Sequence, residues 1–144
     1  MRALFALLAA AAAAVPAYSG SVSVYSSSRF ENLQSKDRTV MLHFYSPTSR
    51  VCLAQVKILD RIVDDPGAYV PAVLSVDFET AAGLRDRFDV KAPGALLLFK
   101  GREMVGDSVG LYTERDIRAF IRDSRMAFRS RPGPRVKRVY RPKR

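Results

Sequence analysis

The chain has 144 residues, with one cysteine, one histidine and a formal net charge of +10. This length fits one domain with short extensions. A single cysteine excludes an intramolecular disulfide, and a structural zinc site would need more cysteine and histidine ligands than the chain has. We therefore expect neither a bound metal nor another cofactor.

The beginning of the chain has the features of a secretory signal peptide. Arg2 precedes an apolar run from Ala3 to Val15, and a small-residue exit follows at Pro16-Ala17. We predict that residues 1–17 are cleaved, with an uncleaved signal anchor as the alternative. The run is shorter than the roughly 20 residues of a membrane span. We therefore expect a mature chain without a transmembrane segment, in the endoplasmic reticulum lumen or secreted.

The first half of the domain alternates strands and helices. Residues 22–25 are a strand candidate, and Ser28 with Glu31 makes a capping box that predicts a helix to about Gln34. The β-branched and aromatic residues of Thr39–Tyr45 predict a buried strand.

The second half repeats this alternation. Ser49 is placed to cap a helix that carries apolar residues at steps of three and four and stops at Asp65-Pro66-Gly67. Five further elements follow in the chain. We expect a strand at residues 71–77, a short helix at 80–88, a strong strand at 95–99, its hairpin partner at 104–109, and a final helix from residue 114 that is capped by Thr113. This order predicts an α/β domain over residues 18–123, with a central mixed sheet flanked by helices on both faces.

The positive charge is concentrated at the C-terminal end. Residues 18–123 contain 14 basic and 14 acidic residues, whereas residues 124–144 contain nine basic residues and no acidic one. We predict that residues 124–144 form a disordered basic tail. Its alternatives are a solvated segment, a docking site for an acidic partner, and proteolytic trimming at dibasic motifs. Its two aromatic residues, Phe128 and Tyr140, offer little stacking surface, so no specific nucleic acid is expected.

One segment resembles the active site of a known family. His43 to Cys52 reads His-Phe-Tyr-Ser-Pro-Thr-Ser-Arg-Val-Cys. It is similar to the segment of protein disulfide isomerase domains in which Phe-Tyr-Ala-Pro-Trp runs into Cys-x-x-Cys at a helix start. The resemblance spans roughly residues 22–123, including the strand Leu96–Lys100 and the pattern of the final helix. It implies a thioredoxin-like fold.

The chain departs from this family where the family's chemistry resides. Ser49 stands at the position of the first cysteine, the nucleophile, and Cys52 at that of the second. Thr48 replaces a tryptophan, and His43 replaces a buried carboxylate that accepts a proton. A hydroxyl cannot undergo thiol–disulfide exchange, so the resemblance implies a domain without dithiol turnover.

Two candidate residues keep two interpretations each. Cys52 is either a buried, unreactive thiol or a thiol that forms a mixed disulfide with a client. His43 is either a structural residue of the strand or a proton acceptor for Cys52. The family's cis-proline position falls on Gly94, or on Pro93 after a shift of one residue, and the sequence leaves both open.

The resemblance also implies a surface that binds extended polypeptide. Its expected residues are Thr48, Arg50, Val51, Pro93 and Gly94. We therefore expect a disulfide-isomerase-like protein of the secretory pathway that binds client or partner polypeptides, with single-thiol chemistry at most. The alternative is a non-catalytic thioredoxin-like subunit anchored to an acidic partner by its tail.

Overall fold

A computed structural model describes residues 22–131 of the chain. The predicted signal peptide, residues 1–17, lies outside the described residues, as do residues 132–144 of the predicted tail.

Five strands form one mixed sheet in the order β1-β3-β2-β4-β5. Their bounds are β1 Val22–Val24, β2 Thr39–Tyr45, β3 Ala72–Asp77, β4 Ala95–Lys100 and β5 Glu103–Val109. The first three strands in chain order run parallel, and β4 is antiparallel to both β2 and β5. Parallel neighbours need a crossover connection, which is why helices alternate with the first three strands. The predicted α/β class is confirmed.

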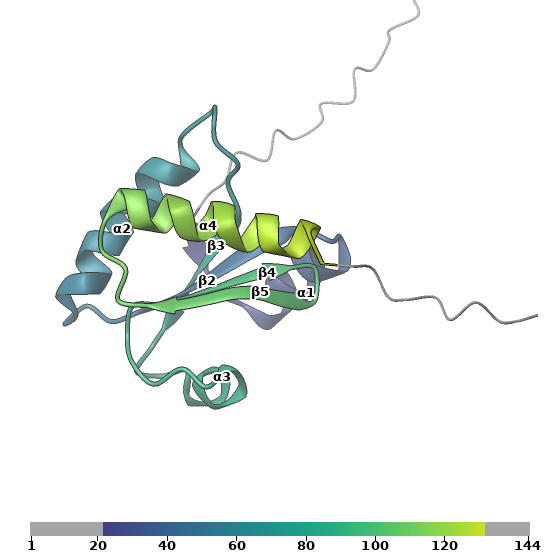
Figure 1. The fold of residues 1–144 in the computed structure, drawn as a ribbon. Coiled ribbons are helices and arrows are strands. Elements are labelled where there is room, and N and C mark those ends of the chain that lie inside the picture. The colour runs from purple at the N-terminus through teal and green to yellow at the C-terminus, as the bar shows by residue number, and fades with distance from the viewer. Residues whose placement is uncertain (1–21, 132–144) are drawn as a thin grey trace, which may run out of the picture.

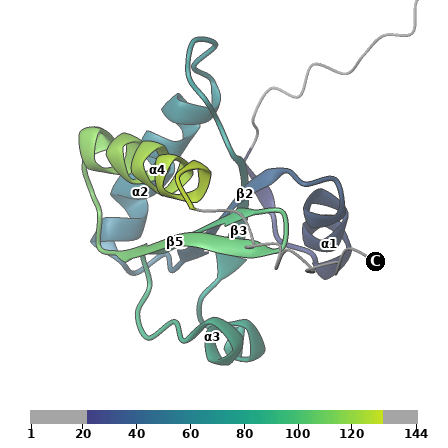
Figure 2. The same ribbon diagram turned by 45° about the vertical axis from the view of Figure 1, so that its right-hand side comes forward.

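Four helices cover the two faces of this sheet (Figures 1 and 2). They are α1 Ser27–Ser35, α2 Arg50–Val63, α3 Ala82–Phe88 and α4 Glu114–Arg129. The helices α2 and α4 pack on one face, and α1 and α3 pack on the other.

The central strand β2 supplies both cores. Val40, Leu42 and Phe44 point to the core under α1 and α3, whereas Met41 points to the core under α2 and α4. A strand buried on both faces reads as a continuous apolar run, which explains why its bounds were predicted correctly. The one polar side chain in its buried part is His43.

Two predicted boundaries are wrong in ways that change the interpretation of a residue, and several others differ by one or two residues. The helix α1 is capped by Ser26, whose hydroxyl accepts a hydrogen bond from the Arg29 N–H at 3.2 Å, so Ser28 lies inside the helix. Three consecutive serines offer equivalent caps, and the sequence pattern selected the wrong one. The helix α4 continues to Arg129, so residues 124–129 belong to the folded domain and not to a disordered tail. Ser124 is buried there because it faces the sheet.

The helix α4 lies very close to β5 at Gly106. A Cβ atom at this position would lie 2.9 Å from Ser124 Cβ and 3.0 Å from a ring carbon of Phe120. Only glycine fits such an approach, so the position of α4 along β5 is fixed by the absence of a side chain.

Candidate functional site

The site begins where β2 ends and α2 starts. Ser49 is the N-cap of α2, and its hydroxyl oxygen accepts a hydrogen bond from the Cys52 N–H at 3.3 Å. The predicted cap is therefore confirmed. The Ser49 oxygen thus satisfies one of the free N–H groups at this helix end.

Cys52 lies one turn into α2 and is fully buried. Its thiol donates to the Phe44 carbonyl oxygen at 3.6 Å, and its sulfur accepts from the Ser46 N–H at 3.5 Å. The structure therefore corresponds to the first interpretation, a thiol paired with the backbone of the β2 end. In this conformation the sulfur has no access to a client disulfide.

The loop beside Cys52 is held by hydroxyl and carboxylate groups. The Ser46 hydroxyl is buried, lies 3.0 Å from Thr48 Oγ1, and donates to Glu79 Oε1 at 3.3 Å. The Glu79 N–H in turn donates to Asp77 Oδ1 at 2.9 Å. These side chains pair with one another across two loops.

The partner of His43 is a glutamine of α2. Its Nε2 lies 3.0 Å from Gln55 Oε1. The Gln55 amide nitrogen donates to the carbonyl oxygens of Gly94 at 3.0 Å and Leu111 at 2.8 Å. Because the amide nitrogen uses both protons on carbonyls, its oxygen must accept, and His43 Nε2 carries the proton.

The structure agrees with the first interpretation of His43, a structural residue of the strand, and the alternative pairing with Cys52 is not formed. Gln55 lies one turn further along α2 and takes the position opposite the imidazole, while the Cys52 sulfur is directed to the backbone of β2. Burial lowers the pKa of His43 from 6.5 to about 4, and the hydrogen bond to Gln55 opposes this only in part. His43 is neutral near pH 7 and stabilises the fold as part of a network linking β2, α2, the β4 start and the loop after β5.

Gln55 was not among the predicted site residues. A signal was present, because Gln55 is a polar residue within the buried stripe of α2 that includes Cys52, Ile58 and Ile62. A histidine in an apolar strand is a second polar group that needs a partner. Two such groups on neighbouring elements indicate a buried hydrogen-bond pair.

The Pro93-Gly94 loop lies beside the start of α2, as predicted. Gly94 has a φ of 85°, and a Cβ atom there would lie 3.0 Å from Val51 Cγ1. Its N–H donates to the Phe44 carbonyl at 2.8 Å, and its carbonyl accepts from Gln55 and from the Gly110 N–H at 3.3 Å. The backbone groups of Gly94 are all used inside the domain. Within residues 22–131 no peptide bond is cis.

The remaining residues of the predicted surface lie around this loop. Thr48 and Arg50 are exposed at the helix start, and Pro93 is half-buried. Two exposed apolar residues that were not predicted flank them: Val109, which pairs with Ala95 in the sheet, and Tyr112. Their exposed fractions of 60% and 65% leave an apolar surface at this end of the sheet.

Neither a membrane-spanning helix nor a cluster of metal ligands is found in the part of the chain that the structure describes. No helix between residues 22 and 131 is long and apolar enough to cross a membrane. Within the same range, no three side chains of the histidine, cysteine, aspartate or glutamate type lie close enough together to hold a metal ion.

Comparison with known proteins identifies the fold. No family model matches the chain, and no curated protein is similar to it in sequence. Among solved structures, Trxlp from Edwardsiella tarda is 25% identical with a TM-score of 0.65, covering 69% of this chain and 97% of its own. Thioredoxin from Trypanosoma brucei brucei is 20% identical with a TM-score of 0.62, covering 75% of this chain and 94% of its own. Thioredoxin from Malassezia sympodialis is 21% identical with a TM-score of 0.61, covering 72% of this chain and 92% of its own. The domain is thioredoxin-like.

Proposed function

We propose that this protein is a secretory-pathway relative of the disulfide isomerases that binds polypeptide without carrying out dithiol exchange. One observation carries the proposal: the chain has a single thiol, and that thiol is buried and paired with backbone groups. Disulfide exchange proceeds by attack of a thiolate on a disulfide sulfur through a mixed disulfide. Here the helix N-terminus holds the Ser49 oxygen, and the chain has no second thiol to release a mixed disulfide.

Binding of client polypeptide would take place at the surface around the start of α2. The exposed side chains of this surface include the apolar Val109 and the aromatic Tyr112 as well as the polar Thr48 and Arg50, and Val51 and Pro93 are half-buried. The backbone of Gly94 is already paired, so recognition would depend on side-chain contacts and not on pairing with that residue. Tyrosine is a residue type that often dominates such interfaces.

A binding assay tests this surface. A reduced, alkylated unfolded protein serves as the probe, because it presents extended chain without disulfides. Tyr112→Ser should weaken its binding about tenfold. Val24→Ser is the matched control, because Val24 is 81% exposed on β1 at the opposite edge of the sheet. Equal binding by both variants would exclude this surface.

A redox assay tests the absence of exchange. The purified chain should not turn over insulin disulfides, because it lacks the second thiol. Catalytic turnover with no other thiol protein present would contradict the proposal.

A second candidate function is a non-catalytic subunit held by its basic end. The observation that favours it is the charge distribution: nine basic residues and no acidic residue follow Asp123. Such a segment attracts acidic partners over several ångströms and loses this attraction in salt. Deleting residues 132–144 should then reduce binding of a native partner strongly in low salt and little in high salt.

Secretory location is part of the proposal. It is supported by the charge and apolar pattern of residues 1–17. Expression of the full chain in cells, followed by N-terminal sequencing of the mature protein, should place the new N-terminus near Tyr18.

A further inference from the structure

Four arginines form a stripe along α4. Arg118, Arg122, Arg125 and Arg129 follow one another at steps of four, three and four. This spacing places them along one side of a helix. The buried residues Ile117 and Ile121 lie on the neighbouring side, so the stripe runs along the edge where α4 meets the rest of the domain.

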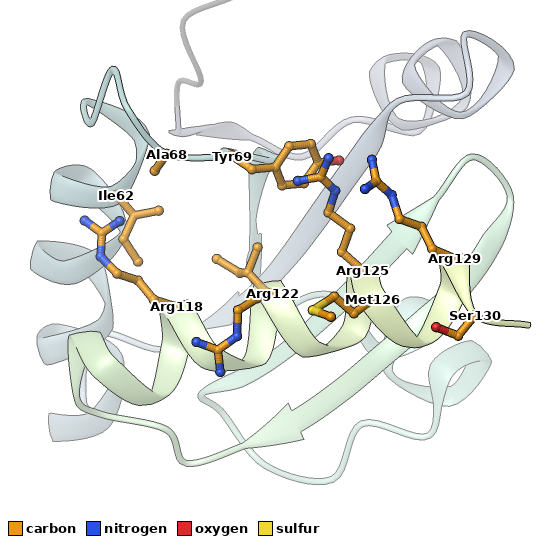
Figure 3. A pocket seen from close by; sticks show the side chains of 10 residues that line it. Ile62, Ala68, Tyr69, Arg118, Arg122, Arg125, Met126, Arg129 and Ser130 are labelled. Atoms are coloured by element: carbon orange, nitrogen blue, oxygen red, sulfur yellow. The ribbon is translucent and has the colours of Figure 1, made fainter.

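A pocket of about 550 Å³ opens between this stripe and the end of α2 (Figure 3). Its apolar part comes from Ile62 and Ile121, with Tyr69 from the loop after α2 and Met126 from α4. Tyr69 and Met126 are 40% and 59% exposed, so this apolar surface is uncovered. The ten residues that line the pocket include four arginines and no acid.

Tyr69 fixes the floor of the pocket. Its ring lies 3.9 Å from the guanidinium carbon of Arg125, and its hydroxyl donates to Thr39 of β2. In Figure 3 the Arg125 and Arg129 side chains extend from the same side of α4 towards Tyr69. A guanidinium stacked on an aromatic ring keeps its edge N–H groups available, and this edge matches the two oxygens of a carboxylate.

The four arginines differ in how far their charge is already neutralised. Arg118 binds Asp65 at 3.0 Å and Glu114 at 2.9 Å. Arg122 makes only an exposed pair with its neighbour Asp123, which is worth little. Within residues 22–131, neither Arg125 nor Arg129 pairs with a carboxylate. Unneutralised positive charge therefore lies at the Tyr69 end of the pocket.

We propose that this pocket binds an acidic segment of a partner protein. An apolar side chain of the segment fills the hollow against Tyr69 and Met126, and flanking carboxylates bind Arg125 and Arg129. Charge complementarity selects the acidic partner, since the pocket has no acid of its own. Its concave shape selects a peptide over a lipid surface, because a side chain enters a hollow that a bilayer surface would only cover.

This site goes beyond the proposed function, because it lies at the other end of α2 from Ser49. Its lining shares no residue with the surface around Val51 and Tyr112. The pocket and the client surface can therefore fail separately, and the unfolded-protein probe and the acidic probe report on them independently. Arg125 and Arg129 are also two of the nine basic residues that follow Asp123, so this proposal shares its acidic ligand with the second candidate function. Deleting residues 132–144 separates the two, because it leaves every lining residue of the pocket in place.

A fluorescence titration tests the proposal. The probe is a short labelled peptide of alternating glutamate and leucine. Two control peptides replace either every glutamate by glutamine or every leucine by serine. Arg125→Gln/Arg129→Gln should weaken binding of the first peptide about tenfold or more. Arg29→Gln/Lys36→Gln removes the same charge from α1 on the opposite face of the sheet and should leave binding within about twofold.

Each outcome decides the proposal. Loss of binding in the arginine variant and with both control peptides supports it, provided that circular dichroism shows the variant folded. Equal binding of the glutamine peptide overturns it, since charge would not matter. Equal weakening by the α1 variant overturns it in favour of nonspecific attraction. Binding to vesicles of anionic phospholipid but not to the peptide overturns it in favour of a membrane surface.

Discussion

The two ends of the helix layer formed by α2 and α4 differ in what they leave available. At the start of α2 the polar groups bind one another: Ser49 caps the helix, Cys52 binds backbone atoms, and Gln55 joins His43 to two carbonyls. At the other end, Arg125 and Arg129 border an apolar hollow without a carboxylate partner among residues 22–131.

This difference indicates which end of the helix layer can bind a partner. Groups that satisfy each other inside the fold stabilise it and are unavailable for chemistry. Charged groups without partners, placed next to uncovered apolar surface, are available for binding. The start of α2 is thus a closed part of this domain, and the arginine side of α4 is open.

The largest effect should appear in thiol labelling. Native Cys52 should react with a maleimide at least about a thousandfold more slowly than the new thiol in Ser49→Cys/Cys52→Ala. Cys52 is fully buried and must wait for an opening of the domain, whereas position 49 is half-exposed. Rates within tenfold of each other would show that Cys52 is reachable, and the distinction between a closed and an open end would fail.

The next largest effect concerns the buried network. Gln55→Leu should lower the free energy of unfolding by about 3 kcal/mol or more, because it leaves His43 Nε2–H and the Leu111 carbonyl without partners. Lys57→Leu, on the exposed side of the same helix, should change it by less than about 0.5 kcal/mol. Denaturant titration measures both. A cost below about 1 kcal/mol for Gln55→Leu would mean that the network contributes little.

A smaller effect should appear in the pH dependence of stability. His43 has a pKa of about 4 when folded and 6.5 when unfolded, so below pH 6.5 the unfolded chain binds a proton that the folded domain does not. The free energy of unfolding should therefore fall by about 2 kcal/mol from pH 8 to pH 5. The arginines do not titrate in this range, so Arg125→Gln/Arg129→Gln should keep this slope. In His43→Leu the slope should disappear, since the chain has no other histidine.

The smallest effect compares the two helix caps. Ser49→Ala and Thr113→Ala should each cost about 1 kcal/mol, because each removes the acceptor for an N–H at the helix start. Thermal unfolding of the two variants measures this. If only Thr113→Ala is destabilising, Ser49 is not held as a cap, and its hydroxyl would be free for another role.

Most of the fold could be predicted because local patterns agreed with the global arrangement. The apolar run of β2 and the caps at Ser49 and Thr113 gave correct elements. The start of α1 could not be predicted, since Ser26, Ser27 and Ser28 are equally able to cap it. The predicted end of α4 was too early. Its last turns are rich in arginine, and this run of basic residues resembles a disordered basic tail.

The site was less predictable, because it depends on contacts between distant segments. The resemblance places Cys52 near the start of a helix. The partner of His43, in contrast, depends on how β2 and α2 are aligned with each other in space. The arginine stripe can be read from its spacing alone. The pocket beside this stripe cannot be predicted from spacing, because it forms where the loop after α2 brings Tyr69 close to α4.

The close approach at Gly106 has a kinetic consequence for the arginine face. Because Ser124 and Phe120 lie close to the β5 backbone at Gly106, the α4 backbone that carries the arginines is packed directly on the sheet, and we expect it to need no rearrangement before an encounter. Association with a partner should then occur in a single step. The observed association rate should fall as ionic strength rises, and it should increase with partner concentration without reaching a plateau. A bulkier residue at position 106 would displace the helix and introduce a slow rearrangement before binding.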